Sequence, residues 1–356
     1  MRALLAAGGT GGHLFPAEAI AAVLGARGHQ VALMTDARAK TLVAKFPAER
    51  VDFLPAATPR VRNPLAAARA LLVLGGAVLK ARKLIKAFAP DVVIGFGGYP
   101  TIPPLKAAQT LGLATVVHEA NAVPGKANRF LAKGATIFTA FPETPGFGKA
   151  TTFVGMPVRE AVKAAARSFE APGETLRLLV FGGSQGARVF ADIVPTALAA
   201  LPAETRGKLA VTQQCRPEDI ERTRAAYEAA GIAADLAPFF MDLPERMANS
   251  HLVVCRSGAS TVAELAVIGR PSLLVPLPGA LDQDQAHNAN ALAAAGGAIA
   301  VPQPEFTAER LTAEIGRIIA APDWLSRAAE AAKGFGRPDA AERFADAAEH
   351  VAEAKR

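Results

Sequence analysis

The same local pattern occurs twice in this chain, once at its beginning and once near its middle. Leu4–Gly12 and Leu178–Gly186 both read as a hydrophobic strand, a Gly-Gly-hydroxyl turn and the start of a helix. Such a turn can hold phosphate, because glycine lets the backbone come close and the free amides and dipole of a helix favour negative charge. The repeat predicts two similar α/β domains, each with an anion-binding loop behind its first strand.

Strands and helices alternate along the rest of the sequence, as they do in parallel sheets with helices on both faces. Segments typical of strands lie at 2–7, 30–35, 50–54, 91–95, 114–118, 136–141, 176–181, 208–212, 252–255, 272–276 and 298–301. Helical segments lie at 15–27, 64–88, 261–268 and 284–295, with Gly28, Gly269 and Gly296 just past three of their ends. We therefore predict two doubly wound, Rossmann-like domains separated by a cleft, at 1–158 and 159–338. A final helix at 339–356 could pack on either domain.

Composition indicates a soluble globular protein, with 51% hydrophobic and 20% charged residues among 356. Cys215 and Cys255 lie far apart, in or beside apolar runs, which favours buried free thiols over a disulfide. Met1–Ala7 is a short apolar strand that runs into glycines and does not resemble a secretory signal. The segment 65–79 contains Arg69 and two glycines and falls short of the about 20 residues that a membrane span needs.

The formal net charge of +7 is concentrated in one segment. No acidic residue occurs between Phe53 and Pro90, and the basic residues there are Arg60, Arg62, Arg69, Lys80, Arg82, Lys83 and Lys86. A helix at 64–88 that buries one face would explain the leucines. An amphipathic cationic helix on anionic lipid also explains the missing acids, and we favour it. This membrane patch comprises Leu71, Leu72, Val78, Leu79, Lys80, Arg82, Lys83 and Lys86. Nucleic acid is not favoured, because no aromatic residues interleave with the cations.

Polar residues follow several strands of the first half, where the carboxyl ends of parallel strands line a binding crevice. His13 opens the helix after the first glycine turn, Tyr99 follows two glycines, and His118–Asn121 ends another strand. A neutral His13 could take a proton from an attacking hydroxyl, or it could cap the helix. The glycine turns could also be tight turns only, and Asp36 keeps a dinucleotide site open as an alternative.

The second half has a comparable cluster. Arg256–Thr261 joins an apolar strand to a helix, and Glu264 lies a turn further on. The Glu264 carboxylate could stabilise the helix dipole, or it could accept hydrogen bonds from two vicinal ribose hydroxyls. Asp282–Gln285 contains an Asp-x-Asp, but no cluster of carboxylates or histidines completes a metal site there. We therefore expect no metal, and expect Gln285 to bond a sugar hydroxyl.

The chain resembles glycosyltransferase family 28, the family of the bacterial N-acetylglucosaminyltransferases that complete the lipid-linked disaccharide of peptidoglycan. The resemblance covers nearly the whole chain and rests on five motifs in order, Gly8–His13, Gly97–Tyr99, His118–Asn121, Gly182–Gly186 and Arg256–Ala259. It implies a GT-B fold with an N-terminal acceptor domain, on which the helix 339–356 packs back, and a C-terminal UDP-GlcNAc domain.

The resemblance also implies an activity and a place in the cell. GlcNAc would pass from UDP-GlcNAc, with inversion and without a cofactor, to the C4 hydroxyl of undecaprenyl-diphospho-MurNAc-pentapeptide. The enzyme would act in cell-wall biogenesis, and so in cell shape and division. It would be peripheral, bound to anionic phospholipid at the cytoplasmic face of the bacterial inner membrane, with other cell-wall synthesis proteins as further partners.

The resemblance assigns roles to residues that match its motifs. Glu264 would hold the ribose, Ser184 the diphosphate and Gln285 the GlcNAc, with Arg256 near the nucleotide and Arg159 at the donor side of the hinge. The implied donor-binding residues are Arg159, Ser184, Gln185, Gly186, Arg256, Ser257, Gly258, Glu264 and Gln285. Thr10, Gly11, Gly12, His13 and Asn121 would bind the acceptor diphosphate, and the implied catalytic residues are His13 as base, Tyr99 and His118.

Two positions depart from the family pattern. Asp284 stands where the family often has the first of two glutamines, and Met156 stands where it usually has asparagine. Asp284 exchanges the amide of one expected sugar contact for a carboxylate, and Met156 removes one polar group at the hinge. Other functions also remain open: another GT-B enzyme, such as a UDP-GlcNAc 2-epimerase or a glycolipid synthase, or a non-catalytic nucleotide-sugar-binding scaffold at the membrane.

Overall fold

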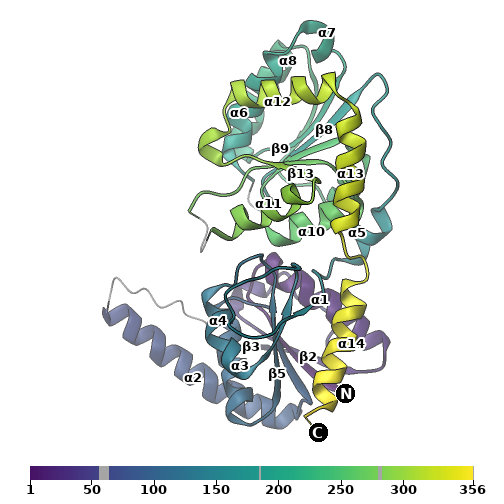
Figure 1. Ribbon diagram of the computed structural model, residues 1–356. Helices are drawn as coiled ribbons and strands as arrows, with labels where there is room; N and C mark the ends of the chain where they lie inside the picture. Colours follow the sequence, from purple (N-terminus) through teal and green to yellow (C-terminus); the bar gives the residue numbers. More distant parts are fainter. Residues whose placement is uncertain (56–63, 184–185, 280–282, 356) are drawn as a thin grey trace. The chain divides into compact units, whose positions relative to one another are not determined.

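The computed structural model describes residues 1–55, 64–183, 186–279 and 283–355, with the backbone alone described for 64–71 (Figure 1). The chain forms two compact units. Unit 1 comprises Met1–Arg159 and Pro338–Arg356, and unit 2 comprises Glu160–Arg337. The chain therefore passes from one unit to the other twice, and the last helix belongs to the unit that contains the first strand.

Unit 1 is built on a seven-stranded parallel sheet in the order β3-β2-β1-β4-β5-β6-β7. Its strands are β1 (Arg2–Ala6), β2 (Gln30–Thr35), β3 (Arg50–Phe53), β4 (Val92–Gly95), β5 (Ala114–Glu119), β6 (Thr136–Thr139) and β7 (Thr152–Phe153). Successive residues of β1 are buried on opposite faces, because side chains alternate along a strand. Leu5 packs in one hydrophobic cluster and Leu4 in the other.

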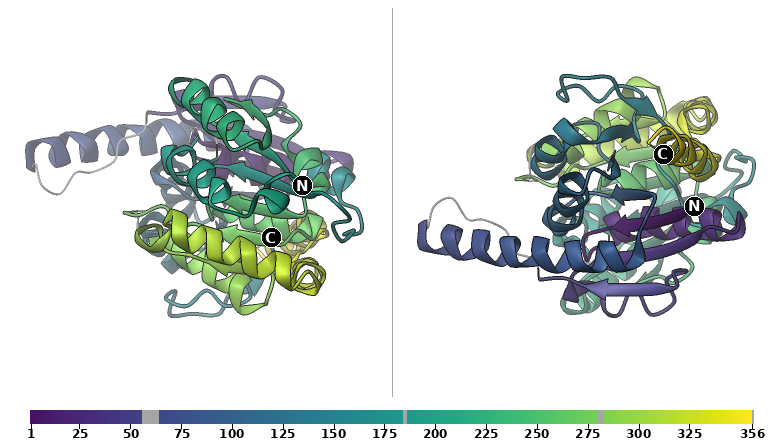
Figure 2. Two further views of the ribbon diagram at one scale, coloured as in Figure 1. Left: turned by 90° about the horizontal axis from the view of Figure 1, so that it is seen from above. Right: turned by 90° about the horizontal axis from the view of Figure 1, so that it is seen from below.

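Helices cover both faces of this sheet (Figures 1 and 2). The Leu5 face is covered by α1 (Gly11–Ala26) and α14 (Ala340–Glu353), which contribute Leu14, Ile20 and Phe344 to the cluster. The Leu4 face is covered by α2 (Pro64–Phe88), α3 (Ile102–Thr110) and α4 (Lys126–Leu131). Short 3-10 helices are η1 (Ala37–Ala39), η2 (Tyr99–Thr101) and η3 (Ala132–Gly134).

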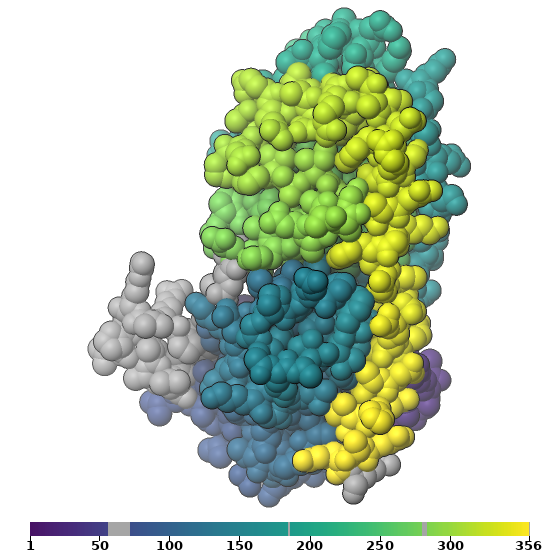
Figure 3. Space-filling model, in the orientation of Figure 1, coloured from purple at the N-terminus to yellow at the C-terminus, as the bar shows by residue number. Residues whose placement is uncertain are grey.

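The helix α14 is fixed to unit 1 mainly through an aromatic side chain. Phe344 is fully buried and contacts Phe96, Phe138 and His118, with ring centroids 5.6, 5.1 and 5.3 Å away. The outer face of the helix stays at the surface (Figure 3).

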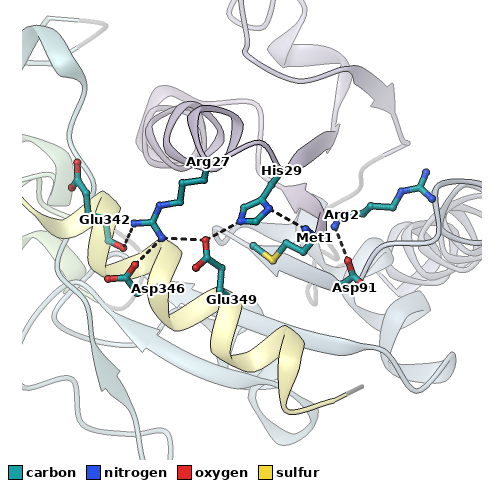
Figure 4. A network of polar contacts seen from close by, with 8 residues as sticks. All are labelled: Met1, Arg2, Arg27, His29, Asp91, Glu342, Asp346 and Glu349. Carbon is teal, nitrogen blue, oxygen red and sulfur yellow. Dashed lines mark hydrogen bonds and ion pairs between the residues drawn. The ribbon is translucent and has the colours of Figure 1, made fainter.

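Around this contact, Arg27 pairs with Asp346 at 2.7 Å, and His29 bridges Glu349 and the Met1 amine (Figure 4). Exposed ion pairs contribute about 0–1 kcal/mol each, so the buried ring contributes more to holding the helix.

Unit 2 repeats the plan with six parallel strands in the order β10-β9-β8-β11-β12-β13. These strands are β8 (Leu176–Phe181), β9 (Leu209–Gln214), β10 (Ala233–Ala237), β11 (Leu252–Cys255), β12 (Ser272–Leu274) and β13 (Ala298–Ala300). One face is covered by α6 (Arg188–Ala199), α8 (Ile220–Ala229) and α12 (Ala308–Ala320). A second helical group centres on α10 (Ala259–Ile268), which contacts α5 (Glu160–Ala165), α9 (Leu243–Asn249), α11 (Asp284–Ala294) and α13 (Asp323–Phe335). The remaining elements are α7 (Ala203–Arg206), η4 (Pro217–Asp219) and η6 (Gln303–Glu305).

Most expected elements are confirmed, and the differences have physical reasons. The first helix begins at Gly11 rather than residue 15, because the glycine turn ends at Thr10, the N-cap residue. The short β7 and the Ala-rich β10 were not expected, since neither has a strand-like sequence and β10 forms by pairing with β9. Gly28, Gly269 and Gly296 adopt the expected left-handed φ of 78°, 73° and 86°.

The cysteines and the apolar segments were also subjects of prediction. Both cysteines, Cys215 and Cys255, are free and buried, as predicted. Among the described residues, no helix combines the length and the apolarity that crossing a membrane would take.

The packing of α14 generates a stability prediction. Phe344→Ala removes a fully buried ring between three aromatic neighbours, and we expect it to lower the free energy of unfolding of unit 1 by about 3–5 kcal/mol. Glu353→Ala, at the exposed end of the same helix, should change it little. Urea unfolding followed by hydrogen exchange of β4 and β5 peptides would measure both. A loss below 1 kcal/mol in Phe344→Ala would contradict the prediction.

Candidate active site

Each sheet has one place where the strand order reverses. In unit 1 the helix after β1, α1, covers one face, while the helix after β4, α3, covers the other. In unit 2 the helix after β8, α6, and the helix after β11, α10, belong to different helical groups. Loops that leave neighbouring strands toward opposite faces part from each other, which opens a ligand site at the carboxyl ends. All four glycine-containing motifs predicted from the sequence follow these four strands.

The first glycine turn is held by a buried carboxylate. Asp36, which is 3% exposed, accepts hydrogen bonds from the Gly9 amide at 2.9 Å and from the Arg38 guanidinium at 2.8 and 2.9 Å. Burial opposes ionisation, but the hydrogen bonds from Arg38 and Gly9 lower the pKa of Asp36 overall. A Cβ at Gly9 would lie 2.8 Å from an Asp36 oxygen, so this position requires glycine. Because the carboxylate is bonded to protein groups, the structure does not favour Asp36 as the ribose ligand of a dinucleotide.

His13 lies between the loops that follow β1 and β4. A Cβ added to Gly8, Gly97 or Gly98 would come within 3.2, 3.2 and 3.4 Å of its ring, so three glycines form the cradle in which the imidazole sits. Gly97 and Gly98 also have φ of 92° and 80°, a backbone that other residues rarely adopt. Thr10 occupies the N-cap position of α1, so His13 is not the helix cap that the sequence left open.

The His13 ring is neutral at pH 7. Burial, followed by the charge of Arg38, lowers its pKa to about 4, although Asp36 acts in the opposite direction. Its Nδ1 lies 3.0 Å from the Thr10 hydroxyl. In the tautomer where Nδ1–H donates to Thr10, Nε2 keeps a lone pair that can accept a proton. Gly11 and Gly12 are the first residues of α1 and directly precede His13.

His118 lies elsewhere. It is the fifth residue of β5, is fully buried, and packs edge-on against Phe96 and Phe344. Its Nε2 donates to the Gly155 carbonyl at 3.3 Å, and its Nδ1 has no hydrogen-bond partner among the described residues. Burial lowers its pKa to about 4. This placement in the core does not favour direct contact with a substrate. It indicates a structural role, in which His118 packs against the residues that follow β4 and β7.

The loop after β5 is organised by a carboxylate that the sequence analysis did not select. Glu119 is 2% exposed and accepts hydrogen bonds from the amides of Asn121 and Gly125 and from the side chains of Asn121 and Asn128. Burial raises the pKa of Glu119, while these donors oppose the rise. Asn128 also donates to the His118 carbonyl and lies beside Gly97. The network holds the predicted acceptor residue Asn121 next to the loop of Gly97 and Tyr99.

Arg159 is placed differently from the expectation. It falls in unit 1, with its guanidinium 4.6 Å from the Phe15 ring centroid and close enough to Glu18 to affect that carboxyl electrostatically. Both partners belong to α1. Arg159 therefore packs on unit 1, which contains the acceptor motifs. Its implied role at the donor side stays a prediction.

The second glycine turn is fixed by its own backbone. A Cβ at Gly182 would lie 2.3 Å from the Ala187 amide nitrogen, so only glycine fits where the loop folds back before α6. Gly183 and Gly186 have φ of 86° and 65°. The Gly182 amide donates to the Gln214 side chain at 3.0 Å, a contact between β8 and β9 that the sequence analysis missed. Ser184 and Gln185, predicted to bind the donor, lie outside the described residues.

Arg256 is a buried cation without a carboxylate partner among the contacts described for it. It is 9% exposed and donates to the carbonyls of Val275 and Pro276 and to the Gln303 side chain at 2.6 Å. Burial lowers its pKa. Its guanidinium lies 5.4 Å from the ring centroid of Phe190, on the first turn of α6. The guanidinium of Arg256 therefore lies near the first turn of α6, the helix that follows the second glycine turn.

The loop after β11 is tied to α11. The Ser257 hydroxyl donates to the Gln285 carbonyl at 2.8 Å, and the Asn288 side chain donates to the Ser257 carbonyl at 3.2 Å. The Gln285 side chain accepts from the Leu277 amide at 3.0 Å. Gln283 precedes α11 with φ of 54°, which is strained for a residue with a side chain. The structure thus brings Arg256, Ser257, Gly258 and Gln285 together at one edge.

Glu264 lies in the second turn of α10, and the first turn has no acidic residue. The helix dipole acts mainly within the first turn, so it stabilises the Glu264 carboxylate only weakly. Glu264 is 9% exposed. Ribose binding by Glu264 stays a prediction. Among the described residues no three His, Cys, Asp or Glu side chains gather as a metal site requires.

Part of the predicted membrane patch lies on the exposed face of α2. Leu72 and Leu79 are 78% and 70% exposed, and Arg82, Lys83 and Lys86 are exposed with them. Leu74, Ala77, Ala81, Ile85 and Phe88 form the buried face. Val78 is partly buried, Lys80 donates to the Phe53 carbonyl, and the Leu71 side chain lies outside the described residues. The N-terminal part of α2 extends beyond the other elements of unit 1 (Figures 1 and 2).

Comparisons with known proteins identify the family of the chain. Residues 3–139 match the N-terminal domain and residues 177–350 the C-terminal domain of glycosyltransferase family 28. The UDP-N-acetylglucosamine--N-acetylmuramyl-(pentapeptide) pyrophosphoryl-undecaprenol N-acetylglucosamine transferase of Methylobacterium nodulans is 55% identical, over 96% of this chain and 94% of its own. The crystal structure of MurG from Acinetobacter baumannii matches with a TM-score of 0.82 at 29% identity, over 98% of this chain and 99% of that one.

A UDP-N-acetylglucosamine 2-epimerase has a TM-score of 0.70 at 14% identity, over 99% of this chain and 96% of that one. At that identity it shares the fold alone. The fold is GT-B, and the protein is a glycosyltransferase. The chain belongs to glycosyltransferase family 28.

The burial of His118 generates a pH prediction. Its pKa is about 4 in the folded protein against 6.5 for an exposed imidazole, so the unfolded chain binds a proton that the folded chain excludes. The free energy of unfolding should therefore fall as the pH falls from about 6.5 to about 4, by up to about 3 kcal/mol from this group. The pH dependence should be weaker in His118→Gln.

Urea unfolding of both proteins between pH 4 and 7.5 would measure this difference. His13 and His251 have lowered pKa values in the same range, but they are present in both proteins and cancel. Parallel curves for the two proteins would contradict the prediction.

Proposed function

We propose that this protein transfers GlcNAc from UDP-GlcNAc to the C4 hydroxyl of undecaprenyl-diphospho-MurNAc-pentapeptide, with inversion and release of UDP. The observation that carries the proposal is full-length similarity to a transferase whose name states this donor and this acceptor. The two glycine turns, each at a switch point, supply sites for two diphosphates.

In this proposal unit 2 binds the donor. The turn Gly182–Gly186 and the N-terminus of α6 face the diphosphate, with the charge of Arg256 beside them. Glu264 accepts hydrogen bonds from the ribose, and Gln285 bonds the GlcNAc. When UDP leaves, negative charge grows on its terminal phosphate, and fixed amides and a buried cation stabilise that charge without reorganising. No metal or cofactor is part of the proposal.

Unit 1 binds the acceptor in this proposal. Thr10, Gly11, Gly12 and the α1 N-terminus bind the lipid diphosphate, and Tyr99 and Asn121 position the sugar. The acceptor oxygen attacks the anomeric carbon as the bond from that carbon to the phosphate oxygen breaks, and the hydroxyl proton passes to His13. A nearby diphosphate raises the pKa of His13 from its low value, which makes the imidazole a better base when the acceptor is bound.

The outer face of α2 supports a peripheral location at the cytoplasmic face of the inner membrane. Leu72 and Leu79 share that face with Arg82, Lys83 and Lys86, so apolar and cationic groups point the same way. Such a surface binds anionic headgroups through charge and inserts its leucines at the interface. An enzyme with a lipid-linked acceptor needs to work at that surface, where other cell-wall synthesis proteins are also candidate partners.

The activity is tested with purified protein, labelled UDP-GlcNAc and the muramoyl lipid. We expect UDP release only when the lipid is present, with or without a chelator. His13→Ala should reduce turnover by at least 100-fold and leave UDP-GlcNAc affinity unchanged, since a general base contributes about 10²–10⁴-fold. Glu264→Ala should weaken UDP-GlcNAc binding. Conversion to UDP-ManNAc would identify an epimerase instead, and nucleotide-sugar binding without turnover would identify a scaffold.

Membrane binding is tested by flotation with phosphatidylglycerol vesicles. Replacing Arg82, Lys83 and Lys86 by Gln should weaken binding at least tenfold, because each cation near an anionic surface contributes about 1 kcal/mol. Lys80 is kept because it bonds to the protein. The control replaces Lys40, Lys45 and Lys133, which are exposed elsewhere on unit 1, and so has the same net charge. Equal losses in both variants, or no loss in the first, would contradict the role of α2.

A further inference from the structure

We propose that Arg216 binds the diphosphate of the sugar donor as a second cation beside the glycine turn of unit 2. The inference rests on the proposed function, because it assigns a new residue to the same donor site. Neither the motifs nor the glycine pattern points to this residue, which follows β9 and not one of the two switch-point strands.

The backbone that carries Arg216 is fixed on both sides. Gln214, the last residue of β9, accepts from the Gly182 amide and donates to the Pro238 carbonyl at 3.1 Å. The Cys215 amide donates to the Ala237 carbonyl at 3.0 Å. The end of β9 is therefore bound to the glycine turn on one side and to the end of β10 on the other. Arg216 leaves the sheet from a rigid position at the carboxyl edge.

The stem of Arg216 packs directly on the glycine turn. A Cβ at Gly186 would lie 3.2 Å from the Arg216 Cγ and 3.7 Å from its amide nitrogen. Gly186 has φ of 65°, and the residue after it is the N-cap of α6. The aliphatic part of Arg216 therefore lies beside Gly186, two residues before the first residue of a helix whose N-terminus favours an anion.

The guanidinium of Arg216 has no hydrogen-bond or ion-pair partner among the described residues, whereas two other arginines of unit 2 have carboxylate partners. Arg222 pairs with Asp192 and Asp219, and Arg246 pairs with Asp235 and Asp242. The nearby Asp219 carboxylate is therefore already paired, and Glu218 is exposed. Arg216 as a whole residue is partly buried.

The chemistry of the turn points to a phosphate as the ligand. Arg256 already donates hydrogen bonds to two carbonyls and to Gln303, so few of its N–H groups remain for a phosphate. A diphosphate carries more charge than one partly engaged guanidinium can balance, and a free guanidinium can bind phosphate through two parallel hydrogen bonds. Arg216 thus supplies the charge and the donors that Arg256 lacks.

The test compares UDP, UMP and uridine binding by calorimetry to the full chain, with uridine measured by competition. Arg216→Ala should weaken UDP binding by about tenfold or more, weaken UMP binding less, and leave uridine binding unchanged. Arg216→Lys should keep part of the UDP affinity, because it retains the charge and loses the bidentate geometry. Arg327→Ala, on the exposed face of α13, is the matched control and should bind all three as the unmodified protein does.

Two outcomes overturn the role of Arg216. Equal UDP affinity in Arg216→Ala and the unmodified protein removes the contact, and an equal loss for UDP and uridine shows damage to the site rather than a lost phosphate contact. If the unmodified protein binds no UDP or UDP-GlcNAc, the proposed function fails instead, so the two failures are distinguishable.

Discussion

The reversal of strand order beside β1 and beside β8 is the constraint on which both sites depend. Each strand of a parallel sheet is connected to the next by a crossover on one face of the sheet. Where two neighbouring strands have crossovers on opposite faces, the loops after these strands diverge and no helix fills the space between them. Backbone amides at such a place lack intrahelical partners and face outward. In this chain both places carry glycine turns, with the cradle of His13 at the first and the hydrogen bonds of Arg256 at the second.

The two turns are alike in sequence but are stabilised differently. In unit 1 side chains hold the turn: Asp36 bonds the Gly9 amide, and His13 fills the space that three glycines leave. In unit 2 the backbone folds on itself, because Gly182 touches Ala187, and the nearby side chains are cations or amides. The first turn therefore holds a neutral imidazole, while the second lies beside the backbone and stem of an arginine, Arg216. This contrast matches the different needs of an acceptor and a donor.

The sequence predicted the fold well, because glycine turns and apolar strands are local signals. The strands 30–35, 176–181 and 252–255 have the expected bounds, and both halves form the parallel sheets that the repeat predicts. The site was predicted less completely, because its support comes from residues far apart in the chain. Gln214 reaches Gly182 only through the pairing of β9 with β8, and the burial of His118 depends on Phe344 of the last helix. Neither contact has a pattern that sequence periodicity could show.

The position of α14 has a consequence for how the protein is made. Unit 1 is the first to leave the ribosome, yet its core lacks Phe344 and the alanines beside it until the last helix has been translated. At roughly 5–20 residues per second, the intervening unit takes on the order of ten seconds or more to synthesise. During that interval α1 covers its part of this sheet face, while the part beside Phe96 and His118 lacks the helix that covers it in the finished protein. The unit that is synthesised first is thus completed last, and the order of synthesis differs from the order of folding.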